Sequence, residues 1–176
     1  YSTWFMAPKT REDLEKRAET HRRIASWTHG LLGRSPDHVA SFVTGLSLKP
    51  EMFEEIGKGF GDNILNYYKY MRQNDICATY TVLPPQGARS PEMYEAAGKK
   101  TPTLRVTDEN DKGVILNGMK MLGTSAIFSN ETWVGNLLPL APNQLKESIT
   151  CPVPLNAPGL TIWSRKPFEK YAVSEF

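Results

Sequence analysis

The feature that most constrains the fold of this chain is a change of hydrophobic period near Asp75. Before Asp75, apolar residues recur at intervals of three and four positions, which predicts α-helices. After it, short runs rich in β-branched residues are separated by turns of proline, glycine and asparagine, which predicts strands. Helices followed by strands predict an α+β fold, with a helical domain at 1–75 and a β domain at 76–176.

Three helices are expected in the first part, over 10–32, 36–45 and 51–71. Thr10 and Asp13 have the spacing of a capping box, and the first helix carries an apolar stripe that we expect to be buried. Gly57, Gly59 and Gly61 lie in the third helix, where each costs about 1 kcal/mol relative to alanine. We therefore expect another segment to pack closely against these glycines.

Six strands are expected in the second part, over 76–83, 103–107, 114–121, 132–138, 148–153 and 160–164. A turn signal at 109–113 separates the second of them from the third.

Composition and charge exclude several classes of protein. Lysine and arginine number 21 against 19 acidic residues, a net charge of +2, which argues against a nucleic-acid surface or a polybasic membrane patch. No apolar run approaches the roughly 20 residues of a membrane span. Cys77 and Cys151 are too few for a disulfide framework or a closed zinc site, and the three histidines form no metal motif. We expect a cytoplasmic protein without a metal, and a piece of a longer polypeptide, since the chain begins without methionine.

The stretch GRSPDHV contains the first candidate site residues. Ser35, Pro36 and Asp37 form a strong helix start, with Arg34 just before it and His38 one turn inside. Amides at a helix start favour an anion, so these two side chains either serve an anion or phenol site or belong to an ordinary solvated turn.

Further along the chain, polar residues lie at the ends of predicted strands. Tyr80 interrupts an apolar strand, 86–89 follows a Pro-Pro turn, and Thr124 follows another strand. A guanidinium, an imidazole and a phenol could together polarise a substrate hydroxyl, but spacing alone does not bring them together. Neither the GxSxG elbow of hydrolases nor a GxxxxGK[ST] phosphate loop is present.

Three segments together resemble a known family: GRSPDHV (33–39), DICATYTVLPPQGARS (75–90) and GVILNGMKMLGTSAIFSNE (113–131). They are similar to the 4-hydroxyphenylacetate 3-monooxygenase family, the large oxygenase components of two-component, reduced-flavin-dependent phenol hydroxylases. The resemblance covers nearly the whole chain. It implies an acyl-CoA-dehydrogenase-like fold, with a helical domain, an antiparallel β-barrel and a C-terminal helical bundle that is missing here.

The resemblance also implies an activity. Members ortho-hydroxylate a phenolic substrate to a catechol, in aromatic compound catabolism, through a C4a-hydroperoxide formed from FADH2 and molecular oxygen. A separate NAD(P)H:flavin reductase supplies the reduced FAD, and the oxygenase is a homo-oligomer, a dimer or tetramer. A phenol becomes nucleophilic at its ortho carbon when a base shares its proton, and a fixed cation stabilises the phenolate that develops.

Carried over by position, the resemblance assigns the substrate contacts. Arg34 contacts the phenol oxygen, and His38, where the prototype has a tyrosine, shares that contact. Tyr80, where the prototype has a histidine, touches both substrate and flavin. Histidine and tyrosine have therefore exchanged places, and we hypothesise that the exchange keeps the same set of imidazole, hydroxyl and guanidinium groups.

The same resemblance assigns the flavin and ring contacts. The segment expected along FAD comprises Gln86, Gly87, Ala88 and Arg89. Thr124 is expected near the flavin ring. Leu137 and Leu138 take the place of small hydroxyl residues over the substrate, which favours an apolar ring pocket and a small, uncharged phenol.

Two alternative functions stay open. One is a non-catalytic flavin-binding or structural remnant. The other is an acyl-CoA-processing flavoenzyme, such as the dehydratases that hold an iron–sulfur cluster with cysteines of the helical domain. Residues 1–75 contain no cysteine, which argues against the second alternative.

Overall fold

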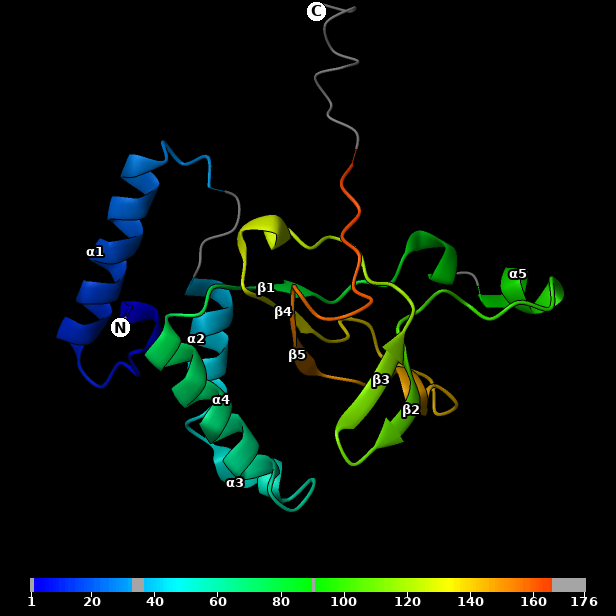
Figure 1. The fold of residues 1–176 in the computed structure, drawn as a ribbon. Helices are drawn as coiled ribbons and strands as arrows, with labels where there is room; N and C mark the ends of the chain where they lie inside the picture. The colour runs from blue at the N-terminus through cyan, green and yellow to red at the C-terminus, as the bar shows by residue number, and fades with distance from the viewer. Residues whose placement is uncertain (1, 33–36, 90, 166–176) are drawn as a thin grey trace, which may run out of the picture.

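The computed structural model describes residues 2–32, 37–89 and 91–165 of the chain. The helices are α1 (Arg11–Trp27), α2 (Asp37–Leu46), α3 (Pro50–Glu54), α4 (Phe60–Asn74) and α5 (Pro91–Ala96). The strands are β1 (Ala78–Thr81), β2 (Arg105–Asn110), β3 (Gly113–Asn117), β4 (Glu131–Val134) and β5 (Cys151–Pro154). Short 3-10 turns are η1 (Thr3–Phe5), η2 (Gln86–Arg89), η3 (Ala126–Phe128) and η4 (Leu145–Glu147). Helices α1 to α4 precede every strand, so the predicted mixed α+β class is confirmed (Figure 1).

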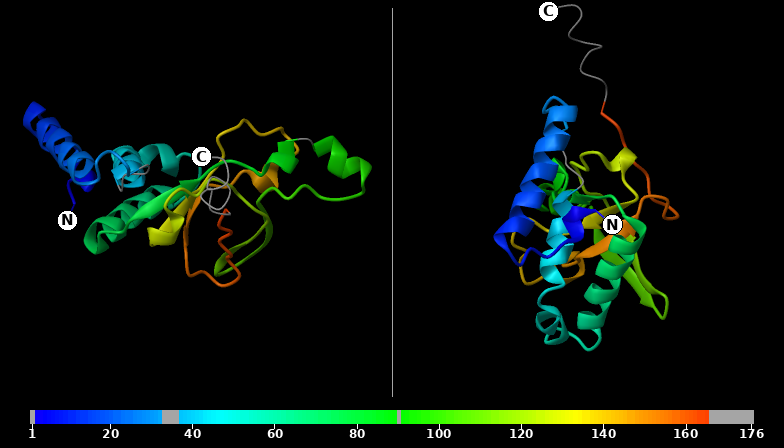
Figure 2. Two further views of the ribbon diagram at one scale, coloured as in Figure 1. Left: turned by 90° about the horizontal axis from the view of Figure 1, so that it is seen from above. Right: turned by 90° about the vertical axis from the view of Figure 1, so that its left-hand side faces the viewer.

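Helix α1 begins where the sequence predicts, but its apolar stripe is not buried as predicted. The Thr10 hydroxyl accepts from the Asp13 amide at 3.2 Å, and the Asp13 carboxylate accepts from the Thr10 amide at 3.2 Å, which completes the capping box. The predicted buried stripe is wrong, because no residue of α1 is buried and Leu14 is 57% exposed. The helix lies at the outer edge of the molecule (Figure 2) and contacts η1 through polar groups, such as the Thr3–Thr20 hydroxyl pair at 3.3 Å.

The third predicted helix is divided into α3 and α4. Gly59 has a φ of +85°, a left-handed conformation that suits glycine and ends the helical path. The Glu54 carboxylate accepts hydrogen bonds from the amides of Gly59, at 2.9 Å, and Gly61, at 3.2 Å, so it supports the start of α4. A Cβ on Gly61 would lie 2.9 Å from the Pro50 carbonyl oxygen, which confirms the expected close packing at Gly61, whereas a Cβ on Gly59 would have no atom within 4 Å.

The strands form two separate sheets. In the first, β1 pairs with β4 in parallel and β4 pairs with β5 in antiparallel, giving the order β1-β4-β5. In the second, β2 and β3 pair antiparallel on either side of the predicted turn. The antiparallel prediction is wrong for β1 and β4, because the long connection between them includes the hairpin and returns the chain in the same direction. The described strands do not close into a barrel, and 160–165 contains no strand where one was predicted.

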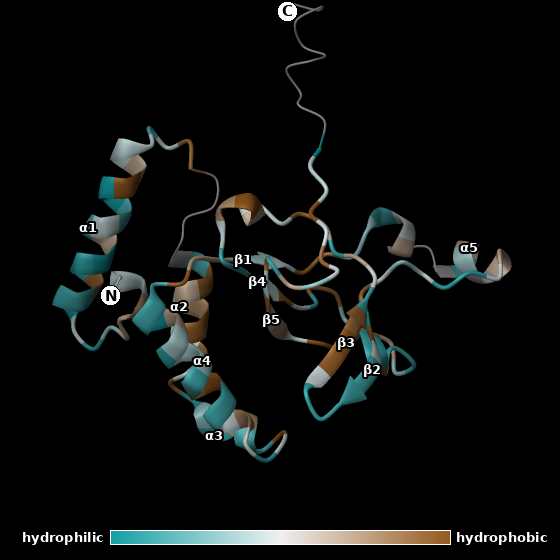
Figure 3. Ribbon diagram, in the orientation of Figure 1, coloured by the Kyte–Doolittle hydropathy of each residue, from teal (hydrophilic) through white to brown (hydrophobic). Residues whose placement is uncertain are grey.

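The apolar core lies between the first sheet and the helices that cover one of its faces. Its members, from η1, α2, α4, β1 and β4, include Phe5, Val43, Met71, Ala78 and Trp133. Figure 3 shows hydrophobic residues along α2, whose Val39 and Val43 side chains are buried, and along β3, whose Val114 and Ile115 side chains are exposed. Packing through this core fixes α2 against β1 and β4.

Candidate functional site at the end of strand β1

The structure brings two of the predicted substrate residues into ring contact. His38, in the first turn of α2, and Tyr80, in β1, have ring centroids 4.7 Å apart with an angle of 31° between the planes. One helical turn further along α2, Phe42 makes an edge-to-face contact with Trp133 at 5.2 Å. Tyr80 and Trp133 are register partners of the parallel pair, so two side chains of α2 lie along two neighbouring side chains of the sheet.

Arg34, the third predicted substrate residue, lies outside the described residues. Its contact with a phenol oxygen beside His38 and Tyr80 therefore stays a prediction.

The loop that carries Thr124 is strained and tightly held. The hydroxyl of Thr79, a buried residue of β1, donates to the Thr124 carbonyl at 2.6 Å, while the Thr124 side chain is exposed. Leu122 and Ser125 have φ values of +67° and +62°, a region that non-glycine residues rarely occupy. Strain of this kind costs about 1–3 kcal/mol for each residue and clusters at functional sites. This backbone strain was not predicted from the sequence.

The segment predicted to lie along FAD forms the turn η2. Gln86 and Gly87 are exposed, and the Ala88 amide donates to the Pro85 carbonyl at 2.9 Å. A Cβ at Gly87 would meet the hydroxyl of Tyr94, so a larger residue there would displace the end of that side chain. The backbone of Arg89 belongs to the same turn, and its side chain lies outside what the structure describes.

A β-bridge joins the chain just before η2 to the chain just before Thr124. Leu83, just before the Pro-Pro turn, forms a β-bridge with Met121, whose amide donates to the Leu83 carbonyl at 2.9 Å. This bridge places the two predicted flavin segments on neighbouring stretches of chain.

Leu137 and Leu138 lie beside the extension of the same strand. The Leu137 amide donates to the Val82 carbonyl at 3.4 Å, and both leucine side chains are at least half exposed, at 65% and 50%. The Lys120 ammonium, which the sequence did not identify, donates to the Gly135 carbonyl and to Asn136 Oδ1, each at 2.8 Å. Partial burial lowers the pKa of Lys120, and its two hydrogen bonds position the segment that leads to the leucines.

Strand β1 and its extension thus organise all the predicted site residues that the structure describes. Tyr80 points at His38, Thr79 holds the Thr124 loop, Val82 binds Leu137, and Leu83 leads to η2. A regular strand that carries exposed loops at its end is a common arrangement for a binding site.

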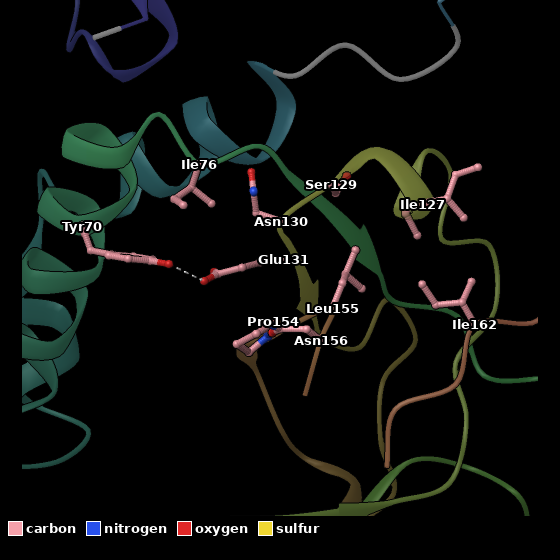
Figure 4. A pocket seen from close by; sticks show the side chains of 11 residues that line it. Tyr70, Ile76, Ile127, Ser129, Asn130, Glu131, Pro154, Leu155, Asn156 and Ile162 are labelled. Atoms are coloured by element: carbon pink, nitrogen blue, oxygen red, sulfur yellow. Dashed lines mark hydrogen bonds between the residues drawn. The ribbon is translucent and has the colours of Figure 1, made fainter. Parts of the chain in front are cut away.

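A separate pocket, of about 680 Å³, lies between α4 and the start of β4 (Figure 4). None of the predicted site residues lines it. Its floor includes Glu131, which is only 5% exposed and accepts hydrogen bonds from the hydroxyls of Tyr67, at 2.7 Å, and Tyr70, at 3.1 Å. Burial, followed by the hydrogen bond to Glu131, raises the pKa of Tyr67 well above its usual range and also raises the pKa of Tyr70. A buried acid at the start of an apolar strand was not predicted.

Two absences hold for the part of the chain that the structure describes. No group of three or more histidine, cysteine or acidic side chains is arranged to hold a metal ion. No helix there has the length and apolar character needed to cross a membrane.

Comparison with known protein families gives a match over the entire sequence. The family model described as 4-hydroxyphenylacetate 3-hydroxylase N terminal covers residues 1–176. The chain belongs to this family. The family resemblance drawn from GRSPDHV and the two longer segments is confirmed.

Individual members of the 4-hydroxyphenylacetate 3-hydroxylase family are moderately similar to the chain. The 4-hydroxyphenylacetate 3-monooxygenase oxygenase component of Geobacillus sp. (strain PA-9) is 28% identical over 167 residues, which cover 94% of this chain and 34% of that protein. The crystal structure of the HpaB oxygenase component with FAD and 4-hydroxyphenylacetate has a TM-score of 0.72 and 26% identity, and covers 90% of this chain and 32% of that one. The chain therefore spans about a third of the length of these relatives.

The fold extends beyond this family of hydroxylases. An oxygen-tolerant 4-hydroxybutyryl-CoA dehydratase from N. maritimus has a TM-score of 0.76 at 21% identity, over 99% of this chain and 35% of that one. At this identity the likeness concerns the fold alone.

Proposed function

We propose that this chain is the N-terminal part of the oxygenase component of a flavin-dependent phenol monooxygenase, which converts a phenolic substrate to a catechol. Residues 1–75 form its helical domain, and 76–176 form part of a β-barrel domain in an acyl-CoA-dehydrogenase-like fold. The observation that carries the proposal is the ring contact of His38 with Tyr80 at 4.7 Å, beside the two segments that the family resemblance assigns to FAD.

The residues near the end of β1 fit a flavin in their chemistry. The exposed amide of Gln86 and the exposed hydroxyl of Thr124 offer hydrogen bonds to the carbonyl and nitrogen atoms of a flavin ring. The Leu83–Met121 bridge holds the two segments together. Reduced FAD, when bound, supplies the activation of oxygen, and the protein supplies binding and orientation.

The substrate residues prepare the phenol. The His38 imidazole accepts the phenol proton, because histidine is the side chain whose ordinary pKa lies nearest neutral pH. The Tyr80 hydroxyl hydrogen-bonds the same oxygen, and the Arg34 guanidinium stabilises the negative charge that develops on it. The resulting phenolate is electron-rich at its ortho carbon, and this is the atom that receives the oxygen.

The remaining proposals concern specificity and partners. Leu137 and Leu138 present exposed apolar surface beside the extension of β1, which favours a small, uncharged phenol over a hydroxyphenyl acid. The reduced flavin comes from a separate NAD(P)H:flavin reductase, and the full-length protein is a homo-oligomer.

The dehydratase fold suggests a different reaction for the same scaffold, and the cysteine positions argue against it. Cys77 and Cys151 both follow the helical segment, so residues 1–75 provide no thiolate for a cluster.

The experiment that tests the proposal uses the full-length protein. It is mixed rapidly with reduced FAD and oxygen, with and without a simple phenol, and catechol and hydrogen peroxide are both measured. We expect catechol in the wild type, and we expect Tyr80→Phe and His38→Ala to shift the products from catechol to peroxide. Tyr68→Phe, in helix α4, is the matched control. Peroxide without catechol for every phenol tried would favour the non-catalytic alternative.

A further inference from the structure

A row of aromatic side chains runs from the candidate site to the separate pocket. It begins at Tyr80, whose register partner Trp133 packs in the same apolar cluster. The ring centroids of Trp133 and Tyr67 are 5.7 Å apart, and those of Tyr67 and Tyr70 are 6.2 Å apart. These side chains come from β1, β4 and α4, so the row crosses the interface between the sheet and the helices.

The last two members of the row share one proton acceptor. The hydroxyls of Tyr67 and Tyr70 both donate to the Glu131 carboxylate, at 2.7 and 3.1 Å. A tyrosine loses an electron near neutral pH only when its phenol proton leaves with it, because the oxidised phenol is a very strong acid. That transfer needs a base at hydrogen-bond distance, and a nearly buried carboxylate is one. The raised pKa values of both tyrosines keep these protons in place until an electron is removed.

The row ends where small molecules can reach it. Tyr70 is 43% exposed and, with Glu131, lines the pocket of about 680 Å³ (Figure 4). A volume of this size is ample for a small organic molecule. The other end of the row, Tyr80, is in contact with His38.

We propose that Trp133, Tyr67 and Tyr70 conduct one-electron oxidising equivalents from the candidate site, beside Tyr80, to this pocket, where a small thiol or ascorbate-like reductant removes them. The conduction rests on the geometry of the row. Its purpose rests on the proposed function: a site where reduced flavin meets oxygen without bound phenol releases superoxide, which is the oxidant and becomes hydrogen peroxide when it gains one electron and two protons from water.

The electrons and protons of this sequence balance. The oxidant takes one electron from the Trp133 indole, which lies beside Tyr80, and Trp133 recovers that electron from Tyr67, whose proton passes to Glu131. Tyr67 then recovers an electron from Tyr70 and a proton from Glu131, and Glu131 takes the proton of Tyr70. Finally the reductant in the pocket gives one electron to Tyr70, and Glu131 returns its proton. The protein is unchanged, the oxidant has gained one electron, and the reductant has lost one.

The test injects the oxidising equivalent without flavin or oxygen. A ruthenium photosensitiser is coordinated to His38 of the full-length protein in which other surface histidines, beginning with His21 and His29, are replaced by glutamine. A light flash excites the ruthenium complex, and a soluble quencher then takes an electron from it and leaves the metal oxidised. We expect a tyrosyl radical, by transient absorption and electron paramagnetic resonance, that is lost in Tyr67→Phe/Tyr70→Phe. Added ascorbate should quench it in the parent protein.

Two variants interrupt the row at defined steps. Trp133→Phe keeps an aromatic ring in the core but removes the oxidisable indole, so the tyrosyl signal should be lost. Glu131→Gln keeps the size of the side chain but removes the proton acceptor, so radical formation should slow and its solvent deuterium isotope effect should change. Circular dichroism and a urea denaturation curve establish that each variant is folded.

The matched control is Tyr68→Phe. Tyr68 is the neighbour of Tyr67 on α4, but its hydroxyl donates to the Phe5 carbonyl at 2.6 Å, outside the row. Its replacement should leave the signal unchanged. A radical that persists in folded Trp133→Phe, or that resides on Tyr68 in the parent protein, would overturn the proposal. Because no flavin takes part, a failure to hydroxylate phenols would leave this result intact, and the reverse also holds.

Discussion

Replacing Tyr67 with phenylalanine tests how the buried carboxylate of Glu131 is held. The substitution removes the donor at 2.7 Å and leaves the Tyr70 hydroxyl at 3.1 Å. A hydrogen bond to a charged group contributes about 1.5–3 kcal/mol, and a buried charge that loses a donor also pays for its desolvation. The phenyl ring stays, so packing against Trp133 at 5.7 Å is retained. We therefore expect the free energy of unfolding to fall by about 2 kcal/mol.

Two other tyrosines on the same helix give the scale for this result. Tyr70 is 43% exposed and its bond to Glu131 is longer, so water replaces its hydroxyl and Tyr70→Phe should cost less than about 1 kcal/mol. Tyr68 donates to a neutral carbonyl, and Tyr68→Phe should cost about 1 kcal/mol. The assay is urea denaturation of each variant, followed by fluorescence and circular dichroism.

A double-mutant cycle at Tyr67 and Glu131 isolates the contribution of the Glu131 charge to this hydrogen bond. With Glu131→Gln in place, the acceptor is neutral, so Tyr67→Phe should cost only about 1 kcal/mol, the value for a neutral hydrogen bond. The reasoning is refuted if Tyr70→Phe destabilises as much as Tyr67→Phe, or if the cost of Tyr67→Phe is the same with glutamate and glutamine at position 131.

Three further predictions follow from other parts of the structure. Because the folded protein raises the pKa of Tyr67, the folded state binds the phenol proton of Tyr67 more tightly than the unfolded state does. The free energy of unfolding should therefore fall as the pH rises above about 10, and it should fall less steeply in Tyr67→Phe. Urea denaturation midpoints measured across that pH range check this prediction. Gly59→Ala should destabilise by about 1 kcal/mol or more in urea denaturation because its φ is +85°, whereas Gly45→Ala, inside α2 with open space around it, should be neutral or stabilising. Lys120→Met should raise the KM for phenol by about fivefold, equivalent to ~1 kcal/mol, by loosening 135–138, with FAD affinity unchanged by titration.

Local signals in the sequence predicted the order of elements and several of their ends. The change of period near Asp75 separates the helices from the strands, and the capping box at Thr10 depends only on residues three positions apart. The turn between β2 and β3 was predicted for the same reason, because its signal at 109–113 is continuous in the chain. Features that depend on contacts within a few residues could therefore be predicted from the sequence.

Long-range features were not accessible in this way. Whether the apolar stripe of α1 is buried depends on what packs against it: Ile24 packs against the core and His21 contacts the Trp4 ring, whereas Leu14 stays exposed. The parallel pairing of β1 with β4 is set by the path of the intervening chain. In the sequence, Glu131 cannot be distinguished from an exposed acid at the start of a strand. Its burial depends on two tyrosines that lie more than 60 residues away in the chain. The contact of His38 with Tyr80 was expected from the family resemblance and not from spacing.

Strand β1 links the register of the sheet to the proposed chemistry. Successive side chains of a strand point to opposite faces, so Tyr80 faces α2 and His38, while Thr79 and Thr81 face the other way. On that second face, Thr79 holds the Thr124 carbonyl at 2.6 Å and Thr81 pairs with the hydroxyl of Thr132 at 3.0 Å. A shift of one residue would turn Tyr80 away from His38 and release the Thr124 loop at the same time. The pairing of β1 with β4 therefore sets the positions of the proposed substrate residue and of the proposed flavin loop together.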